Sequence, residues 1–222
     1  MDAPIINAES EQYNFTNEIA YGKKISFHKN IMGMWLIQDC RRIWSELDFG
    51  EIAQMALEAE SLSYVFDVDD PRLNKPEKMV GAITGLLEEK YGTAVSDQAT
   101  IIRSVYESLA LKYRWVAEQV EKITGQSYDR LYVIGGECQN AVLNQFIANC
   151  LGRTVVAGPV EATAIGNLLV QAIASEELGS LHEARSVVLA SEDVSVFEPS
   201  RDRRERNAWD AAYEEFVRIY VS

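Results

Sequence analysis

The sequence predicts an α/β fold with parallel strands. From residue 130 onward, short apolar stretches typical of buried strands alternate with amphipathic stretches of helix length. A long amphipathic segment precedes this alternation. The pair Gly135-Gly136 follows the first of the alternating strands. Parallel strands are joined by crossover helices, so we expect the sheet to be covered where those helices pack.

The first fifty residues predict a hairpin followed by a helix. Apolar residues of strand type occur over 14–27, and Tyr21-Gly22-Lys23 indicates a turn between two strands. A helix is expected from about Asn30, because apolar residues then recur at spacings of three and four. These residues are Ile31, Met34, Trp35, Ile43, Trp44 and Leu47.

Residues 49–95 have a mixed pattern, which we interpret as a helical and loop insertion. A short helix is predicted near 52–59 and a longer one over 77–91, with an acidic, proline-containing loop over 67–76 between them. Asp67-Val68-Asp69-Asp70 resembles the opening of a calcium loop. Pro71 and Lys78 then stand where ligands are needed, so a solvated acidic turn is expected and no metal ligand is assigned.

The strongest helix signal follows. Ser96 or Asp97 is placed to cap its start, and Gly125 is placed to end it. One apolar stripe runs along it through Ile102, Val105, Leu109, Tyr113, Val116, Val120 and Ile123.

The second half predicts three strands and three helices. In order these are a strand over 130–134, a helix over 140–151, a strand over 154–157, a helix over 161–174, a strand near 194–197 and a helix over 201–220. Gly166 lies inside the second of these helices. A helix-interior glycine costs about 1 kcal/mol relative to alanine, so we expect it either to pack closely against the sheet, the favoured interpretation, or to allow the approach of a ligand.

Composition excludes several classes of partner. The 222 residues hold 21 Lys and Arg against 34 Asp and Glu, a net charge of −13. Such a surface repels nucleic acid and anionic lipid, and no apolar run approaches the roughly 20 residues of a membrane span. Three cysteines and an acidic start, Met1-Asp2-Ala3-Pro4, indicate a reducing compartment and no signal peptide. We therefore expect a cytoplasmic protein.

The feature most suggestive of chemistry is Ile134-Gly135-Gly136-Glu137-Cys138-Gln139-Asn140, between a strand and a helix. Glycines let a ligand approach the backbone, and the N-terminus of the following helix suits a phosphate. A plain tight turn explains the same pattern, because this is neither a Walker loop nor a dinucleotide fingerprint. His28 and His182 stand alone, so neither is assigned as a catalytic base or a zinc ligand.

Four segments together resemble the C-terminal portion of the FGGY carbohydrate kinases, within the branch that acts on L-rhamnulose. They are Asn14-Phe15-Thr16-Asn17-Glu18, Lys29-Asn30-Ile31-Met32-Gly33-Met34-Trp35-Leu36, Gly135-Gly136-Glu137-Cys138-Gln139-Asn140 and Ala157-Gly158-Pro159-Val160-Glu161-Ala162-Thr163. The resemblance implies a ribonuclease-H-like domain of the actin/hexokinase type, with a mixed sheet flanked by helices. It also implies ATP-dependent phosphorylation of L-rhamnulose at its 1-hydroxyl, with Mg²⁺.

The resemblance also implies a set of site residues. Gly135 and Gly136 would lie along the nucleotide phosphates, Gln38 would contribute to the nucleotide site, and Asn140 would face the adenosine. Asn30 would lie on the sugar side. The partners implied are ATP and a small sugar.

Two residues depart from the family pattern within these segments. Ile19-Ala20 stand where the family usually has two glycines, and Glu137 stands where the glycine loop usually has a third. A carboxylate repels phosphate oxygens at short range. We therefore expect the Glu137 side chain to face solvent, and Glu137→Gly to leave ATP binding equal or slightly tighter.

Compared with the family, residues 1–222 correspond to a C-terminal domain that lacks its first strands. The sugar-binding domain, the amino-terminal phosphate loop and the general base belong to the preceding part, so no catalytic residue is assigned here. We expect the chain alone to be inactive and prone to self-association through an open sheet edge. L-fuculose kinase, another ketose kinase, and a non-catalytic actin-like scaffold remain as alternatives.

Overall fold

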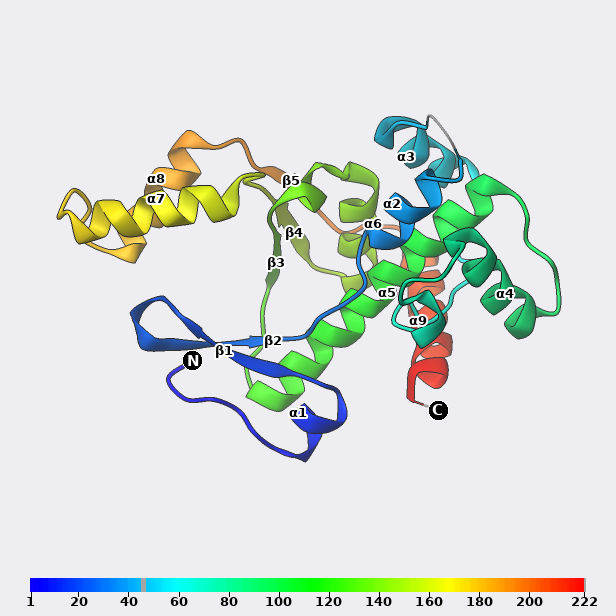
Figure 1. Ribbon diagram of the computed structural model, residues 1–222, viewed down its shortest axis with the longest axis horizontal. Coiled ribbons are helices and arrows are strands. Elements are labelled where there is room, and N and C mark those ends of the chain that lie inside the picture. The colour runs from blue at the N-terminus through cyan, green and yellow to red at the C-terminus, as the bar shows by residue number, and fades with distance from the viewer. Residues whose placement is uncertain (45–46, 222) are drawn as a thin grey trace.

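Helix α5 (Gln98–Thr124) is the central element of the structure, a computed structural model that describes residues 1–44 and 47–221. The Asp97 carboxylate accepts from Thr100 N–H at 2.8 Å at its start, and Gly125, at φ +68°, ends it. Both predicted limits are confirmed, with Asp97 rather than Ser96 as the cap. Figure 1 shows α5 running through the middle of the molecule.

The predicted hairpin is confirmed. Strand β1 (Thr16–Ala20) pairs antiparallel with β2 (Lys24–His28), and the turn Tyr21–Lys23 between them contains Gly22 at φ +72°. A short helix, α1 (Ala8–Gln12), precedes it. It was not predicted, because five residues are too few to show a helical period.

The main sheet is mixed, as expected. Strand β3 (Arg130–Val133) runs parallel to β4 (Thr154–Ala157), and β5 (Ser195–Phe197) is antiparallel to β4, in the order β3-β4-β5. Helix α6 (Ala141–Leu151) makes the crossover between β3 and β4 and packs against α5. Helix α9 (Arg203–Val221) packs against both helices.

Three helices between the hairpin and α5 complete the packed body. They are α2 (Trp35–Arg41), α3 (Phe49–Glu58) and α4 (Met79–Tyr91). The expected start of α2 near Asn30 is wrong, because Gly33 takes a left-handed conformation at φ +61° and holds residues 31–34 in a turn. Residues 45 and 46, inside the apolar pattern used for that prediction, lie outside the described part of the chain.

Helices α7 (Ala162–Ala174) and α8 (Leu181–Ser191) project from the body and contact each other, as Figure 1 shows. No residue of α7 is buried, and an added Cβ at Gly166 meets nothing within 4 Å. The expectation that Gly166 packs closely on the sheet is therefore wrong. Helix α8 was missed, although Ser180 caps it through Glu183 N–H.

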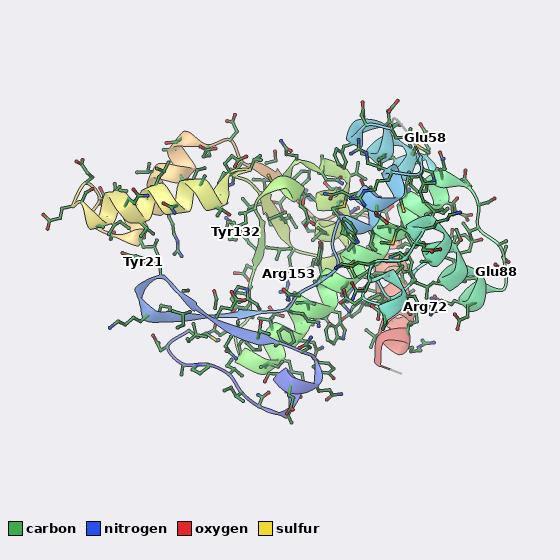
Figure 2. All side chains as sticks on the ribbon, viewed as in Figure 1. Tyr21, Glu58, Arg72, Glu88, Tyr132 and Arg153 are labelled. Carbon is green, nitrogen blue, oxygen red and sulfur yellow. The ribbon has the colours of Figure 1, made fainter. Side chains whose placement is uncertain are left out.

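Several exposed side chains mark the surface of the body and of the hairpin. Figure 2 shows Glu58, Arg72 and Glu88 on the helical body, and exposed Tyr21 and Tyr132 on the hairpin and β3. Across the described residues, we find no helix with both the length and the apolarity needed to cross a bilayer.

The burial of α5 predicts a contrast between two leucines. Leu109 in α5 is 0% exposed, whereas Leu168 in α7 is 66% exposed. We expect Leu109→Ala to lower the free energy of unfolding by about 2–5 kcal/mol, and Leu168→Ala to change it by no more than about 0.5 kcal/mol. Urea unfolding of the two variants measures this, and equal losses would contradict the assignment of the core.

A buried carboxylate on α5 predicts a pH effect. Glu107 accepts from Leu62 N–H at 2.8 Å and from Arg103 Nε at 2.7 Å, yet burial raises its pKa from 4.5 to about 7. Between about pH 4.5 and pH 7 the folded chain then holds more protons than the unfolded chain, so stability falls as pH rises.

We expect wild type to lose stability relative to Glu107→Gln across this window, because the stabilisation from the protonated Glu107 is complete below about pH 4.5 and lost toward pH 7. Urea unfolding at several pH values measures the difference. Exposed Glu88 offers the control variant Glu88→Gln. Parallel curves for wild type and Glu107→Gln would contradict the prediction.

Candidate functional site

The glycine loop lies where the two parallel strands end. Gly158 N–H donates to the Val133 carbonyl at 2.8 Å, and Gly135 N–H donates to the Pro159 carbonyl at 3.1 Å. The loops after β3 and β4 are thus tied together at the carboxyl edge of the sheet, the usual place for ligands in open α/β sheets. Gly135 has φ +81° and ψ −164°, a conformation that is essentially restricted to glycine.

A cavity of about 760 Å³ adjoins this loop. Its walls come from residues 31–35, α2, the start of α3, and the segment from Gly136 to the start of α6. Three of the predicted nucleotide residues, Gly136, Gln38 and Asn140, line it together although α5 and many other residues separate them in sequence. Gly135 lies next to the lining, and Asn30 is exposed on the turn that leads into it.

Asn140 is held in place by two neighbouring helices. Its Oδ1 accepts from Leu143 N–H at 3.0 Å and so caps α6, and its Nδ2 donates to the Tyr106 hydroxyl at 2.8 Å. Burial raises the pKa of Tyr106, which keeps the phenol protonated. The Asn140 side chain therefore forms a fixed part of the cavity wall.

Sequence reasoning missed two aromatic residues of the cavity. Trp35 was counted only as an apolar helix position, and Phe49 follows the Asp48 cap of α3. The Arg42 guanidinium lies 5.1 Å from the Trp35 ring centroid and that of Arg41 lies 4.1 Å from the Phe49 ring centroid. No spacing in the sequence links these rings, because they come from different helices.

Glu137 does not face solvent, so that expectation is wrong. Its Oε1 accepts from Met34 N–H at 3.3 Å and its Oε2 accepts from the Tyr113 hydroxyl at 3.2 Å. Burial and the neighbouring carboxylate raise the pKa of Tyr113, so the phenol stays a donor. These two donors hold the carboxylate against the turn before α2 and against α5.

The acidic turn is only partly solvated, since the Asp67 and Asp69 side chains are 25% and 22% exposed. Lys112 of α5 is fully buried, and its Nζ lies 2.8 Å from Asp69 Oδ2 and 3.4 Å from Asp67 Oδ1. The second Asp69 oxygen accepts from Met32 N–H at 3.0 Å. Two aspartates of the expected solvated turn thus pair with a buried lysine, which the sequence pattern did not reveal because the cation comes from another element.

Comparison with known proteins places these features in a family. Residues 2–175 match the C-terminal domain of the FGGY family of carbohydrate kinases. Rhamnulokinase of Bacteroides thetaiotaomicron is 38% identical over 215 residues, which cover 97% of this chain and 44% of the relative. Rhamnulokinase of Bacillus subtilis is 34% identical over 197 residues, which cover 88% of this chain and 41% of the relative. The chain thus spans less than half the length of these relatives.

Solved structures share the fold. Xylulose kinase from Lactobacillus acidophilus superposes with a TM-score of 0.72 at 14% identity, covering 98% of this chain and 43% of that one. Plasmodium falciparum glycerol kinase, solved with ADP, superposes with a TM-score of 0.65 at 17% identity. The match covers 93% of this chain and 42% of the glycerol kinase. The expected ribonuclease-H-like fold of the actin/hexokinase type is confirmed. With most of its length matched, the chain belongs to the FGGY family of carbohydrate kinases.

Proposed function

We propose that this chain is the nucleotide-binding part of a kinase that transfers the γ-phosphate of ATP to L-rhamnulose, giving L-rhamnulose 1-phosphate. The observation that carries the proposal is the cavity at the carboxyl edge of the sheet, where Gly136, Gln38 and Asn140 meet. The relatives named rhamnulokinase support the choice of sugar.

The cavity has the parts that a nucleotide needs. An added Cβ at Gly136 meets nothing within 4 Å, so the backbone there is open to approach by a phosphate. The next helix, α6, begins at Ala141 and offers its N-terminus to an anion. Trp35 and Phe49 give the opposite side apolar surface against which a base can stack.

We assign the remaining parts of the reaction to the portion of the relatives that this chain does not cover. Phosphoryl transfer needs a positioned hydroxyl, a base and a clamp on the phosphates, and this chain supplies part of the clamp. Asn30 is placed to border the sugar. We propose that Mg²⁺ enters the reaction bound to the nucleotide.

We further propose self-association of the isolated chain. Strand β3 is an edge strand of its sheet. Tyr132 in this strand is 62% exposed, and Ile134 directly after it is 59% exposed. An unpaired strand edge is a template for another strand. Leu168 and Leu189 add exposed apolar surface on the projecting helices.

A cytoplasmic location is part of the same proposal. Cys40, Cys138 and Cys150 are all free and buried. Burial raises the pKa of the Cys138 thiol at the glycine loop. Unpaired thiols suit a reducing compartment.

The proposed phosphate path predicts a specific effect at Gly136. Gly136→Val places a branched side chain in open space beside the loop, so we expect ATP affinity to fall at least about tenfold while the free energy of unfolding changes by less than about 1 kcal/mol. Calorimetric titration with ATP measures the affinity. Gly166→Val in exposed α7 is the control, and equal ATP affinity in the two variants would remove the loop from the site.

We assign the general base to the portion of the relatives that this chain does not cover, and positioning the phosphates does not supply a proton acceptor. We therefore expect the 222-residue chain to phosphorylate no sugar. A coupled assay of ADP release with L-rhamnulose, L-fuculose and D-xylulose tests this beside a full-length relative. Sugar-dependent turnover near the relative's rate would overturn the prediction and require a base within this chain.

A further inference from the structure

We propose that Glu137 is a positioning residue that joins the two walls of the cavity, the glycine loop and the turn of residues 31–34. This inference rests on the proposed function for its link to ATP. The structural link itself does not depend on it.

The side chain of Glu137 connects three separate elements. Its backbone belongs to the short 3₁₀ turn Gly136–Gln139, directly after the glycine that borders the cavity. Its two carboxylate oxygens accept from Met34 N–H at 3.3 Å and from the Tyr113 hydroxyl of α5 at 3.2 Å. The glycine loop is thereby attached to the turn before α2 and to the central helix.

Gly33 is matched to this carboxylate. It has φ +61°, and a Cβ added there would lie 3.1 Å from Glu137 Oε1, closer than ordinary contact. Glycine at this position therefore allows the turn and also leaves room for the acceptor oxygen.

The far side of the same turn is anchored in the core. Asp69 accepts from Met32 N–H at 3.0 Å and pairs with buried Lys112, the residue before Tyr113 in α5. Both carboxylates that hold the turn therefore bond to neighbouring residues of one buried helix. The turn is held at Met32 by the core and at Met34 by the glycine loop.

The link has a consequence for nucleotide binding. Gln38 lies one helical turn beyond Met34 in α2, so the distance between Gln38 and Gly136 depends on how firmly the turn is held. Removing the carboxylate leaves the turn held at Met32 alone and takes away its bond to the glycine loop. We now expect Glu137→Gly to weaken ATP binding, in place of the neutral effect expected from the sequence.

Amide hydrogen exchange on the nucleotide-free chain tests the link first. We expect Glu137→Gly to raise the exchange rate of Met34 N–H about tenfold or more, because its charged acceptor is lost. Glu137→Gln keeps an acceptor oxygen and should stay within about threefold of wild type. Asp129→Asn, which removes a charge from an exposed residue before β3, is the control and should match wild type.

Further variants keep the test decisive if Glu137→Gly folds poorly. Tyr113→Phe removes one donor to the carboxylate and should raise Met34 exchange by an intermediate factor. Gly33→Ala should also raise it, whereas Gly22→Ala, at φ +72° with open space around its Cβ, should not. Both substitutions strain a left-handed backbone, but only Gly33→Ala also crowds the Glu137 carboxylate. A difference between the two variants therefore reports the contact with Glu137.

The ATP titration then separates this inference from the proposed function. We expect Glu137→Gly to bind ATP at least about fivefold more weakly than wild type and Glu137→Gln to bind within about twofold. Absence of ATP binding by wild type would count against the proposed function. The exchange rates of Met34 N–H would still test whether Glu137 joins the two walls of the cavity. Unchanged Met34 exchange in Glu137→Gly, or equal exchange in the Gly and Gln variants, would overturn the inference.

Discussion

The burial of helix α5 is the constraint on which the rest of the structure depends. From Ile101 to Leu111 most of its side chains are inaccessible to solvent, and α3, α4, α6 and α9 all pack against it. A helix enclosed in this way must satisfy its polar residues internally, because an unpaired buried charge is costly. Arg103, Glu107 and Lys112 are accordingly paired within the packed body.

These internal pairs connect the core to the candidate site. Lys112 holds Asp69, and Asp69 holds the turn at Met32. One residue further along α5, Tyr113 holds Glu137 of the glycine loop. The cavity is therefore shaped by polar contacts that begin in the centre of the protein, which gives its walls less freedom than exposed loops usually have.

The projecting helices α7 and α8 and the edge strand β3 are different in character. They carry apolar residues that the rest of the described chain does not cover, including Leu168 and Tyr132. Exposed apolar surface of this kind is the basis of the self-association that we propose for the isolated chain.

The sequence by itself determined the main elements. The stripe on α5, the turn at Gly22 and the strands and helices after Arg130 other than α8 were correct, because local periodicity and capping control them. It also indicated which residues to examine at the site, since the glycine loop lies at the end of a strand. The start of α2 was wrong because one left-handed residue, Gly33, outweighs an apolar period.

Only the tertiary structure decided where the acidic side chains point and what lies beside the glycine loop. Glu137 was expected in solvent because a carboxylate repels phosphate oxygens, and the acidic turn was expected there because it lacks the ligands of a calcium loop. Their partners, Tyr113, Met34 N–H and Lys112, come from elements distant in sequence. The meeting of Gln38 with Gly136 has the same origin, since a cavity wall is formed by packing between elements, and packing leaves no local period in the sequence.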